Sequence, residues 1–179
     1  MNPYLILVLT VIVLSFAIQI LADYLDVTRA AEQLPDELSG VYSAEKYRES
    51  QAYLKENSRF NGLYGALQTL VELLMILGGG FNLIDLVARG FGLGPIPTGL
   101  LFFAIIALGW KALTLPFSLF RTFVIEEKYG FNRTTPRTYL ADLARGIALS
   151  VMIGGPVLPL ILWLFETGGS LAWLYCWGA

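Results

Sequence analysis

Two opposite charges lie inside hydrophobic segments of this 179-residue chain. Glu72 follows the start of one apolar run, at Gly62, and Lys111 precedes the end of the next, at Phe120. At the rise of an α-helix, Glu72 lies about 15 Å from Gly62 and Lys111 about 13.5 Å from Phe120. Because the two consecutive runs are antiparallel, these two ends lie on the same side of the membrane, and the two charges are therefore at nearly the same depth. An ionised group at such a depth in a membrane costs several kcal/mol unless it is paired or hydrated. Two interpretations stay open: a structural ion pair, or residues that line a water-filled interior. Gln68, one turn from Glu72 on the same face, would share either environment.

Other reactive side chains are scarce. The sequence contains no histidine, which excludes imidazole metal ligands and catalytic Ser-His or Cys-His pairs within this chain. Its single cysteine, Cys176, cannot form an internal disulfide and lies among aromatic residues, so we expect an apolar residue that faces the membrane. We therefore predict no catalytic residue, no metal ligand and no cofactor site in this chain.

Long apolar segments of the chain must position Glu72, Lys111 and Gln68. Hydrophobic residues make up 56% of the chain and charged residues 15%, whereas soluble domains are about half apolar and a quarter charged. Four runs are long enough to cross a bilayer: 4–22, 62–88, 98–120 and 139–165. A fifth, 170–179, would reach only about 15 Å, so it either stops halfway or continues in a longer natural protein. We predict an all-α, polytopic transmembrane helical bundle.

Basic residues predict the orientation of this single membrane domain. They concentrate in two loops, 23–61 and 121–138, which the positive-inside rule places in the cytoplasm. The N-terminus is then outside, and because no Lys or Arg precedes the first run, we expect a retained anchor rather than a cleavable signal. Asp142 and Arg145, three residues apart at the inner end of the fourth run, are predicted to form an interfacial salt bridge. We expect a multi-pass integral membrane protein, in the cytoplasmic membrane if the source is prokaryotic.

The first loop is long enough to hold a helix. Ser43 is placed to cap it, and Glu45 suits its first turn. Tyr53 and Phe60, seven residues apart, belong to a narrow apolar stripe. We predict a cytoplasmic helix that either lies solvated on the lipid headgroups or docks a cytosolic domain.

Glycine and proline interrupt the predicted spans. The second span contains three consecutive glycines, 78–80, which permit a kink or a close helix contact. Three prolines are predicted to bend the third and fourth spans: Pro116, Pro156 and Pro159. Bent helices leave room between them, which suits a cavity.

The third loop carries a recognisable motif. From Phe123 to Pro136 it reads F-V-I-E-E-K-Y-G-F-N-R-T-T-P. The first loop contains two further segments, Y-S-A-E-K-Y at 42–47 and S-Q-A-Y at 50–53. Together these segments resemble the integral-membrane CAAX prenyl protease 1 family over nearly the whole chain. The motif residues here are Glu126, Gly130, Phe131, Asn132, Thr134, Pro136 and, beyond the loop, Asp142.

The resemblance implies an α-helical membrane barrel of seven spans that encloses a large chamber. It also implies a cytoplasmic zinc metalloprotease domain after the fifth span, in which H-E-x-x-H binds the metal and its glutamate activates a water molecule. None of those catalytic residues can be assigned here, because the chain has no histidine. Only the membrane-embedded N-terminal region matches.

Three functions follow as hypotheses. The first is the N-terminal membrane region of such a protease, which anchors the enzyme, forms chamber wall and admits a peptide or prenylated-peptide substrate. Its partners would be the lipid bilayer and its own downstream protease domain, and the net charge of −2 gives no reason to expect nucleic acid. The second is a non-catalytic membrane scaffold or binding protein with the same fold. The third is a small transporter, which only Glu72 and Lys111 support.

Overall fold

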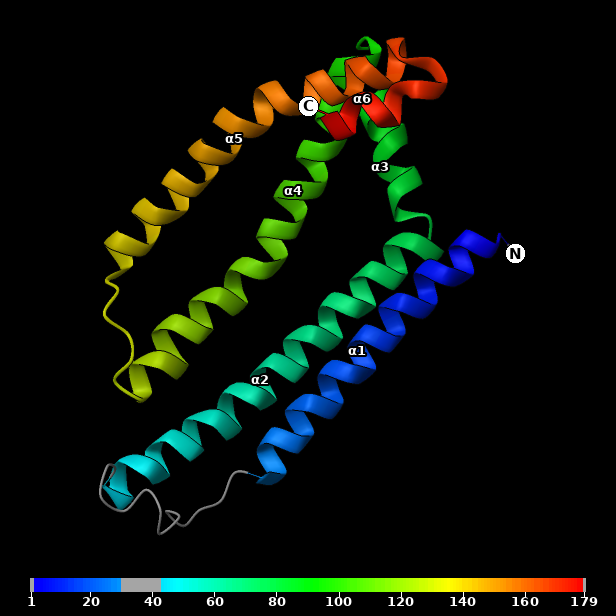
Figure 1. Cartoon of the computed structure of the whole chain (residues 1–179). Helices are drawn as coiled ribbons and strands as arrows, with labels where there is room; N and C mark the ends of the chain where they lie inside the picture. Colours follow the sequence, from blue (N-terminus) through cyan, green and yellow to red (C-terminus); the bar gives the residue numbers. More distant parts are fainter. Residues whose placement is uncertain (1, 30–42, 179) are drawn as a thin grey trace. The chain divides into compact units, whose positions relative to one another are not determined.

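The chain folds into helices. This computed structural model describes residues 2–29 and 43–178, and within those ranges it contains no strand. The elements are α1 (Pro3–Arg29), α2 (Ala44–Leu77), α3 (Gly80–Arg89), α4 (Pro95–Phe120), the π-helical turn η2 (Arg121–Glu126), α5 (Pro136–Thr167), the 3-10 turn η3 (Gly169–Leu171) and α6 (Ala172–Gly178) (Figure 1). The predicted all-α fold is confirmed.

Four helices are long and apolar enough to cross a membrane: α1, α2, α4 continued by η2, and α5. Their large apolar side chains are exposed or half-buried, and among the described residues the only buried apolar ones are Ala88, Ile125 and Ala172. A soluble fold would bury such side chains against each other, whereas lipid solvates them. The chain is therefore a multi-pass integral membrane protein.

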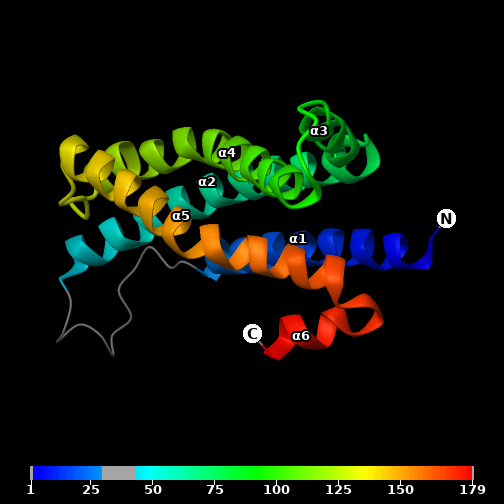
Figure 2. The same ribbon diagram turned by 90° about the horizontal axis from the view of Figure 1, so that it is seen from above.

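The helices form two compact units. The first contains α1, α2, the end of α4 from Phe117, and the chain through η2 to Asn132. Here α1 and α2 lie side by side (Figures 1 and 2), and Phe16 on α1 packs close to Gly65 on α2. An added Cβ at Gly65 would lie 3.8 Å from the Phe16 ring, so this contact is ordinary van der Waals packing.

The predicted cytoplasmic helix and the start of the second span are one helix. Helix α2 runs for 34 residues from Ala44 without a break at Gly62. Ser43 caps it as predicted, since its hydroxyl accepts a hydrogen bond from the Lys46 N–H at 3.3 Å, and Glu45 lies in the first turn. At the other end of the predicted first loop, residues 23–29 continue α1 beyond the predicted end of the first span, while 30–42, including Tyr42 of the first-loop segment, lie outside the described residues.

The second predicted span, 62–88, is divided in the structure at its run of three glycines, where the sequence permits a kink. Helix α2 ends at Leu77 and α3 begins at Gly80. Between them Gly79 has a φ of 72°, in the left-handed region that a residue without a Cβ adopts at little cost. The glycines thus mark the position of the break, whereas hydropathy follows the apolar side chains across it and takes no account of backbone conformation.

The second unit holds α3, α4 as far as Pro116, α5 and α6. Within it α3, the start of α4, the end of α5 and α6 gather at one end (Figures 1 and 2). Helices α4 and α5 approach closely at Gly99, where an added Cβ would lie only 2.8 Å from Leu162. The short fifth run forms η3 and the seven-residue α6, which packs against α5.

Replacing Gly79 with alanine should lower the free energy of unfolding by about 1 kcal/mol, because alanine is strained at positive φ. The control is Gly146→Ala inside α5; both glycines have open space around the position of an added Cβ, but only Gly79 has a positive φ. Alanine at Gly146 should be neutral or slightly stabilising because it favours helix. Thermal unfolding in detergent, followed by far-UV circular dichroism, measures both, and equal effects would contradict the role assigned to Gly79.

Candidate functional site

The third-loop motif is held against α2 by one carboxylate. Glu56 presents a single oxygen, Oε2, to two donors: the Lys128 ammonium at 2.6 Å and the Tyr129 hydroxyl at 2.7 Å. The residues are separated by 72 and 73 positions in the chain, so the contacts are tertiary. A carboxylate bonded to an ammonium and a phenol forms charge-assisted hydrogen bonds, which are shorter and stronger than neutral ones.

Aromatic rings pack beside this carboxylate. Tyr53 lies one turn before Glu56 on α2, and its ring meets Tyr129 edge-on at 5.4 Å and Phe131 at 4.8 Å between centroids. Lys128 also lies 5.2 Å from the Tyr129 ring centroid. Edge-to-face packing at these distances is favourable beyond the apolar area it buries. The rings therefore reinforce the same contact between α2 and the motif.

Both donors keep their protons at neutral pH. The hydrogen bond to Glu56 is the main cause that raises the pKa of Lys128 above its ordinary 10.5, and likewise the pKa of Tyr129 above 10.0. In each case the protonated form is the one that bonds to the carboxylate. The cluster therefore stays intact throughout the physiological pH range.

The backbone of the motif makes a tight turn after η2. The Glu126 carbonyl accepts hydrogen bonds from the N–H groups of Phe131 at 2.9 Å and Asn132 at 3.1 Å. Gly130 has a φ of 71°, which this reversal requires and which favours glycine. The Asn132 amide donates to the Glu127 carboxylate at 2.8 Å and fixes the end of the turn.

The remaining motif residues shape the ends of the adjacent helices. Glu126 also pairs with Arg121, Nε to Oε1 at 3.6 Å, across η2. Pro136 is the first residue of α5, and Thr135 before it caps the helix by accepting from the Thr138 N–H at 3.2 Å. Proline suits this position because its missing N–H would have no partner there. Motif residues on both sides of the loop thus define where helices stop and start.

The predicted intramembrane residues lie in different units. Gln68 is half-buried and donates to the Tyr64 hydroxyl at 3.0 Å, and Tyr64 in turn packs on Phe117 with ring centroids 5.1 Å apart. Glu72 is half-buried on α2 in the first unit, while Lys111 is exposed on α4 in the second. Their interaction therefore stays a prediction.

The predicted pair at the start of α5 is confirmed. Arg145 Nη1 lies 3.0 Å from Asp142 Oδ1, and both side chains are exposed. An exposed pair three residues apart on a helix contributes only a few tenths of a kcal/mol. It is a local surface contact, and it serves below as a control.

Sequence reasoning missed Glu56 as the residue that binds the motif. It noted Tyr53 and Phe60 as an apolar stripe, but Glu56 lies between them at helical spacing on the same face of α2. A lone carboxylate within an aromatic stripe was the available signal. Its partners could not be identified because they are far away in the chain.

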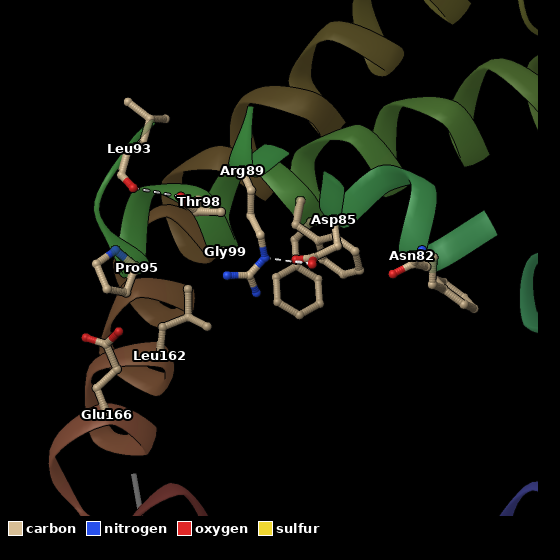
Figure 3. A pocket seen from close by; sticks show the side chains of 12 residues that line it. Asn82, Asp85, Arg89, Leu93, Pro95, Thr98, Gly99, Leu162 and Glu166 are labelled. Atoms are coloured by element: carbon tan, nitrogen blue, oxygen red, sulfur yellow. Dashed lines mark hydrogen bonds and ion pairs between the residues drawn. The ribbon is translucent and has the colours of Figure 1, made fainter. Parts of the chain in front are cut away.

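A pocket of about 850 Å³ opens within the second unit, between α3, the start of α4 and the end of α5 (Figure 3). Phenylalanines and Leu162 form its apolar part. Asp85, Arg89 and Glu166 supply its charges, and Arg89 Nε bonds to Asp85 Oδ2 at 2.7 Å. No role for these residues was predicted from the sequence.

The described residues do not fit a catalytic zinc. Across residues 2–29 and 43–178, no three Cys, Asp or Glu side chains are placed to hold a metal ion together, and the sequence has no histidine. Structural and catalytic zinc sites need three or four such ligands.

Comparisons with known proteins agree with the motif. A family profile described as "CAAX prenyl protease N-terminal, five membrane helices" matches residues 23–179. The CAAX prenyl protease 1 homolog of Oryza sativa is 33% identical and the match covers 98% of this chain and 43% of the relative. The Homo sapiens homolog is 34% identical over 83% of this chain and 33% of its own length.

A solved structure shows the same fold. The crystal structure of S. mikatae Ste24p matches 98% of this chain with a TM-score of 0.86, at 23% identity. The match covers 43% of that protein, and the chain spans less than half the length of the curated relatives it matches.

Removing the Tyr129 hydroxyl (Tyr129→Phe) should lower the free energy of unfolding by about 1 kcal/mol, the typical net contribution of a hydrogen bond. In a Glu56→Gln background the same change should cost less, because the ionised acceptor is already gone. A double-mutant cycle by thermal unfolding in detergent measures this coupling. The control Arg145→Gln should be nearly neutral, and zero coupling between Glu56 and Tyr129 would refute the contact.

The same variants have a defined pH dependence. Because the pKa of Glu56 is lowered and the pKa values of Lys128 and Tyr129 are raised, their stabilisation is complete between pH 4.5 and pH 10.0. It is lost as pH falls through the lowered value or rises through the raised ones. The stability difference between the native chain and Glu56→Gln should therefore be constant at neutral pH and shrink above pH 10.5. A difference that persists unchanged in that alkaline range would show that Glu56 stabilises the chain by another route.

Proposed function

The chain belongs to the CAAX prenyl protease 1 family, and from this premise we propose that it forms the N-terminal membrane region of a zinc metalloendopeptidase acting at the membrane. It anchors the enzyme, forms part of the wall of its chamber and admits a peptide or prenylated-peptide substrate. The zinc chemistry belongs to a later domain with H-E-x-x-H. The observation that carries the proposal is the loop of the family motif, 123–136, which contacts Glu56 on α2 through Lys128 and Tyr129.

This contact has a positioning role in the proposed enzyme. A loop whose backbone turns at Gly130 and whose side chains bind Glu56 is fixed against α2 without covalent support. A loop held in one conformation presents a constant surface to the protease domain, and such surfaces keep reacting groups aligned. The positioning residues are Glu56, Lys128 and Tyr129, and none of them needs to contact substrate.

Basic residues support the orientation in which the motif faces the cytoplasm, where the protease domain of the proposed enzyme works. The basic clusters after the first and third predicted spans would then lie inside, and the N-terminus and the turn before α4 outside. In this orientation Glu56 and its partners lie in or near the cytoplasmic headgroups.

Cysteine labelling tests this orientation. In a Cys176→Ser background, Ser43→Cys and Thr134→Cys should resist a membrane-impermeant thiol reagent in intact cells and react after permeabilisation. The control Gly92→Cys, in the turn before α4, should react in intact cells. Labelling of Ser43→Cys or Thr134→Cys from outside would overturn the proposed topology.

A chimera tests the function. This chain would replace the matching N-terminal region of the Oryza sativa CAAX prenyl protease 1 homolog, which retains its own remaining sequence. We expect the chimera to cleave a prenylated reporter peptide and Glu56→Gln within it to lower cleavage between about ten- and a hundredfold through misalignment. A chimera that inserts and folds but does not cleave, beside an active parent, would favour the scaffold hypothesis.

The chain on its own provides a further control. Because its residues do not fit a zinc site, we expect no stoichiometric zinc and no peptidase activity from residues 1–179 alone. Elemental analysis of the purified chain measures the first, and one tightly held zinc per molecule would contradict it.

A further inference from the structure

The pocket of the second unit has the position and chemistry of a lipid site, and we propose that it binds one glycerophospholipid with a zwitterionic headgroup. The occupant comes from the membrane leaflet that surrounds the start of α4 and the end of α5. This binding is independent of proteolysis, because neither the motif nor Glu56 contributes to the pocket.

The depth of the pocket matches a lipid headgroup with the first part of its acyl chains. On α4 the pocket extends from Pro95, the first residue of the helix, to Phe103, which is about 12 Å further along the axis. On α5 it involves Leu162 and Glu166, just before the helix ends at Thr167. It therefore begins at the ends of two membrane-spanning helices and reaches inward by less than half the hydrocarbon thickness of about 30 Å.

Tryptophans mark this end of the unit as interfacial. Trp163 lies on α5 one turn before Thr167, and Trp173 and Trp177 lie on α6, all three with exposed side chains. Tryptophan is enriched where the hydrocarbon meets the headgroups, because its ring is apolar and its N–H needs a polar partner. The pocket consequently opens where phospholipids are the most abundant amphiphiles.

The lining has an apolar part and a charged part, as the binding of an amphiphile requires. Phe81, Phe102, Phe103 and Leu162 offer an apolar surface from three helices. Arg89 and Asp85 on α3 and Glu166 on α5 carry the charges, and in Figure 3 Leu162 separates Glu166 from the Arg89–Asp85 pair. A volume of about 850 Å³ is large enough for a headgroup and part of a chain.

The three charges select a zwitterion. Arg89 uses Nε for Asp85, and its guanidinium has further N–H donors suited to a phosphate. Glu166 offers a carboxylate that can accept from an ammonium group. The three charges sum to −1, so a phosphate beside Arg89 is favoured only when a positive group accompanies it. Phosphatidylethanolamine supplies both, whereas phosphatidylglycerol brings a phosphate without the ammonium.

Native mass spectrometry of the purified full chain tests the proposal with phosphatidylethanolamine and phosphatidylglycerol as probes. The unmodified chain should bind one phosphatidylethanolamine and prefer it to phosphatidylglycerol. Arg89→Gln should weaken binding about tenfold, the effect of losing a charged hydrogen bond, and Arg89→Lys should recover most of it. Glu166→Gln should abolish the preference between the two lipids.

Arg145→Gln is the matched control, since Arg145 is also an exposed arginine paired with an aspartate on a helix of the same unit. It should leave binding within about twofold, an effect of a few tenths of a kcal/mol. Thermal unfolding of each variant confirms that it is folded. Equal binding by Arg89→Gln and Arg145→Gln, tighter binding of phosphatidylglycerol, or displacement of the lipid by one equivalent of a prenylated peptide would each overturn the proposal.

Discussion

The structure depends on one constraint of the bilayer: each backbone N–H and C=O inside hydrocarbon must be bonded within the chain. Helices satisfy this locally, and the apolar side chains of the four long helices are exposed or half-buried instead of packed into a buried core. Burial of apolar surface contributes little between helices in lipid, because lipid tails are as apolar as the side chains. What specifies this fold is therefore a small set of backbone reversals and polar contacts near the helix ends.

Two glycines illustrate these reversals. Gly79 ends the helical path of α2 and lets α3 begin as a separate element of the second unit, and Gly130 turns the motif back onto the Glu126 carbonyl. Each adopts positive φ, where a side chain would cost about 1 kcal/mol or more. Without the break at Gly79, α3 would continue α2, and the wall of the pocket that carries Asp85 and Arg89 would not exist as a separate helix.

The sequence predicted what depends on local interactions. The apolar runs predicted the all-α fold and the spanning segments. The Ser43 cap and the Asp142–Arg145 pair were also predicted correctly, because both contacts join residues within one turn of a helix. The three glycines of the second span indicated where it could kink, but not that it divides into two helices, because hydropathy contains no information on φ. Glu56 was missed because its partners lie 72 and 73 residues away, and Glu72 with Lys111 stays a prediction because the two belong to different units.

The Glu56 contact is partly exposed, with 57% of the Lys128 side chain and 34% of the Glu56 side chain accessible, so the surroundings can compete for each hydrogen bond. A surface ion pair alone would contribute little under these conditions. Here one carboxylate oxygen accepts from two donors, and the rings of Tyr53, Tyr129 and Phe131 pack beside them. Rings that displace water strengthen the remaining polar interaction, since the local dielectric falls. The aromatic residues and the carboxylate therefore act as one unit, and the motif needs both kinds of residue to hold its loop in a single conformation.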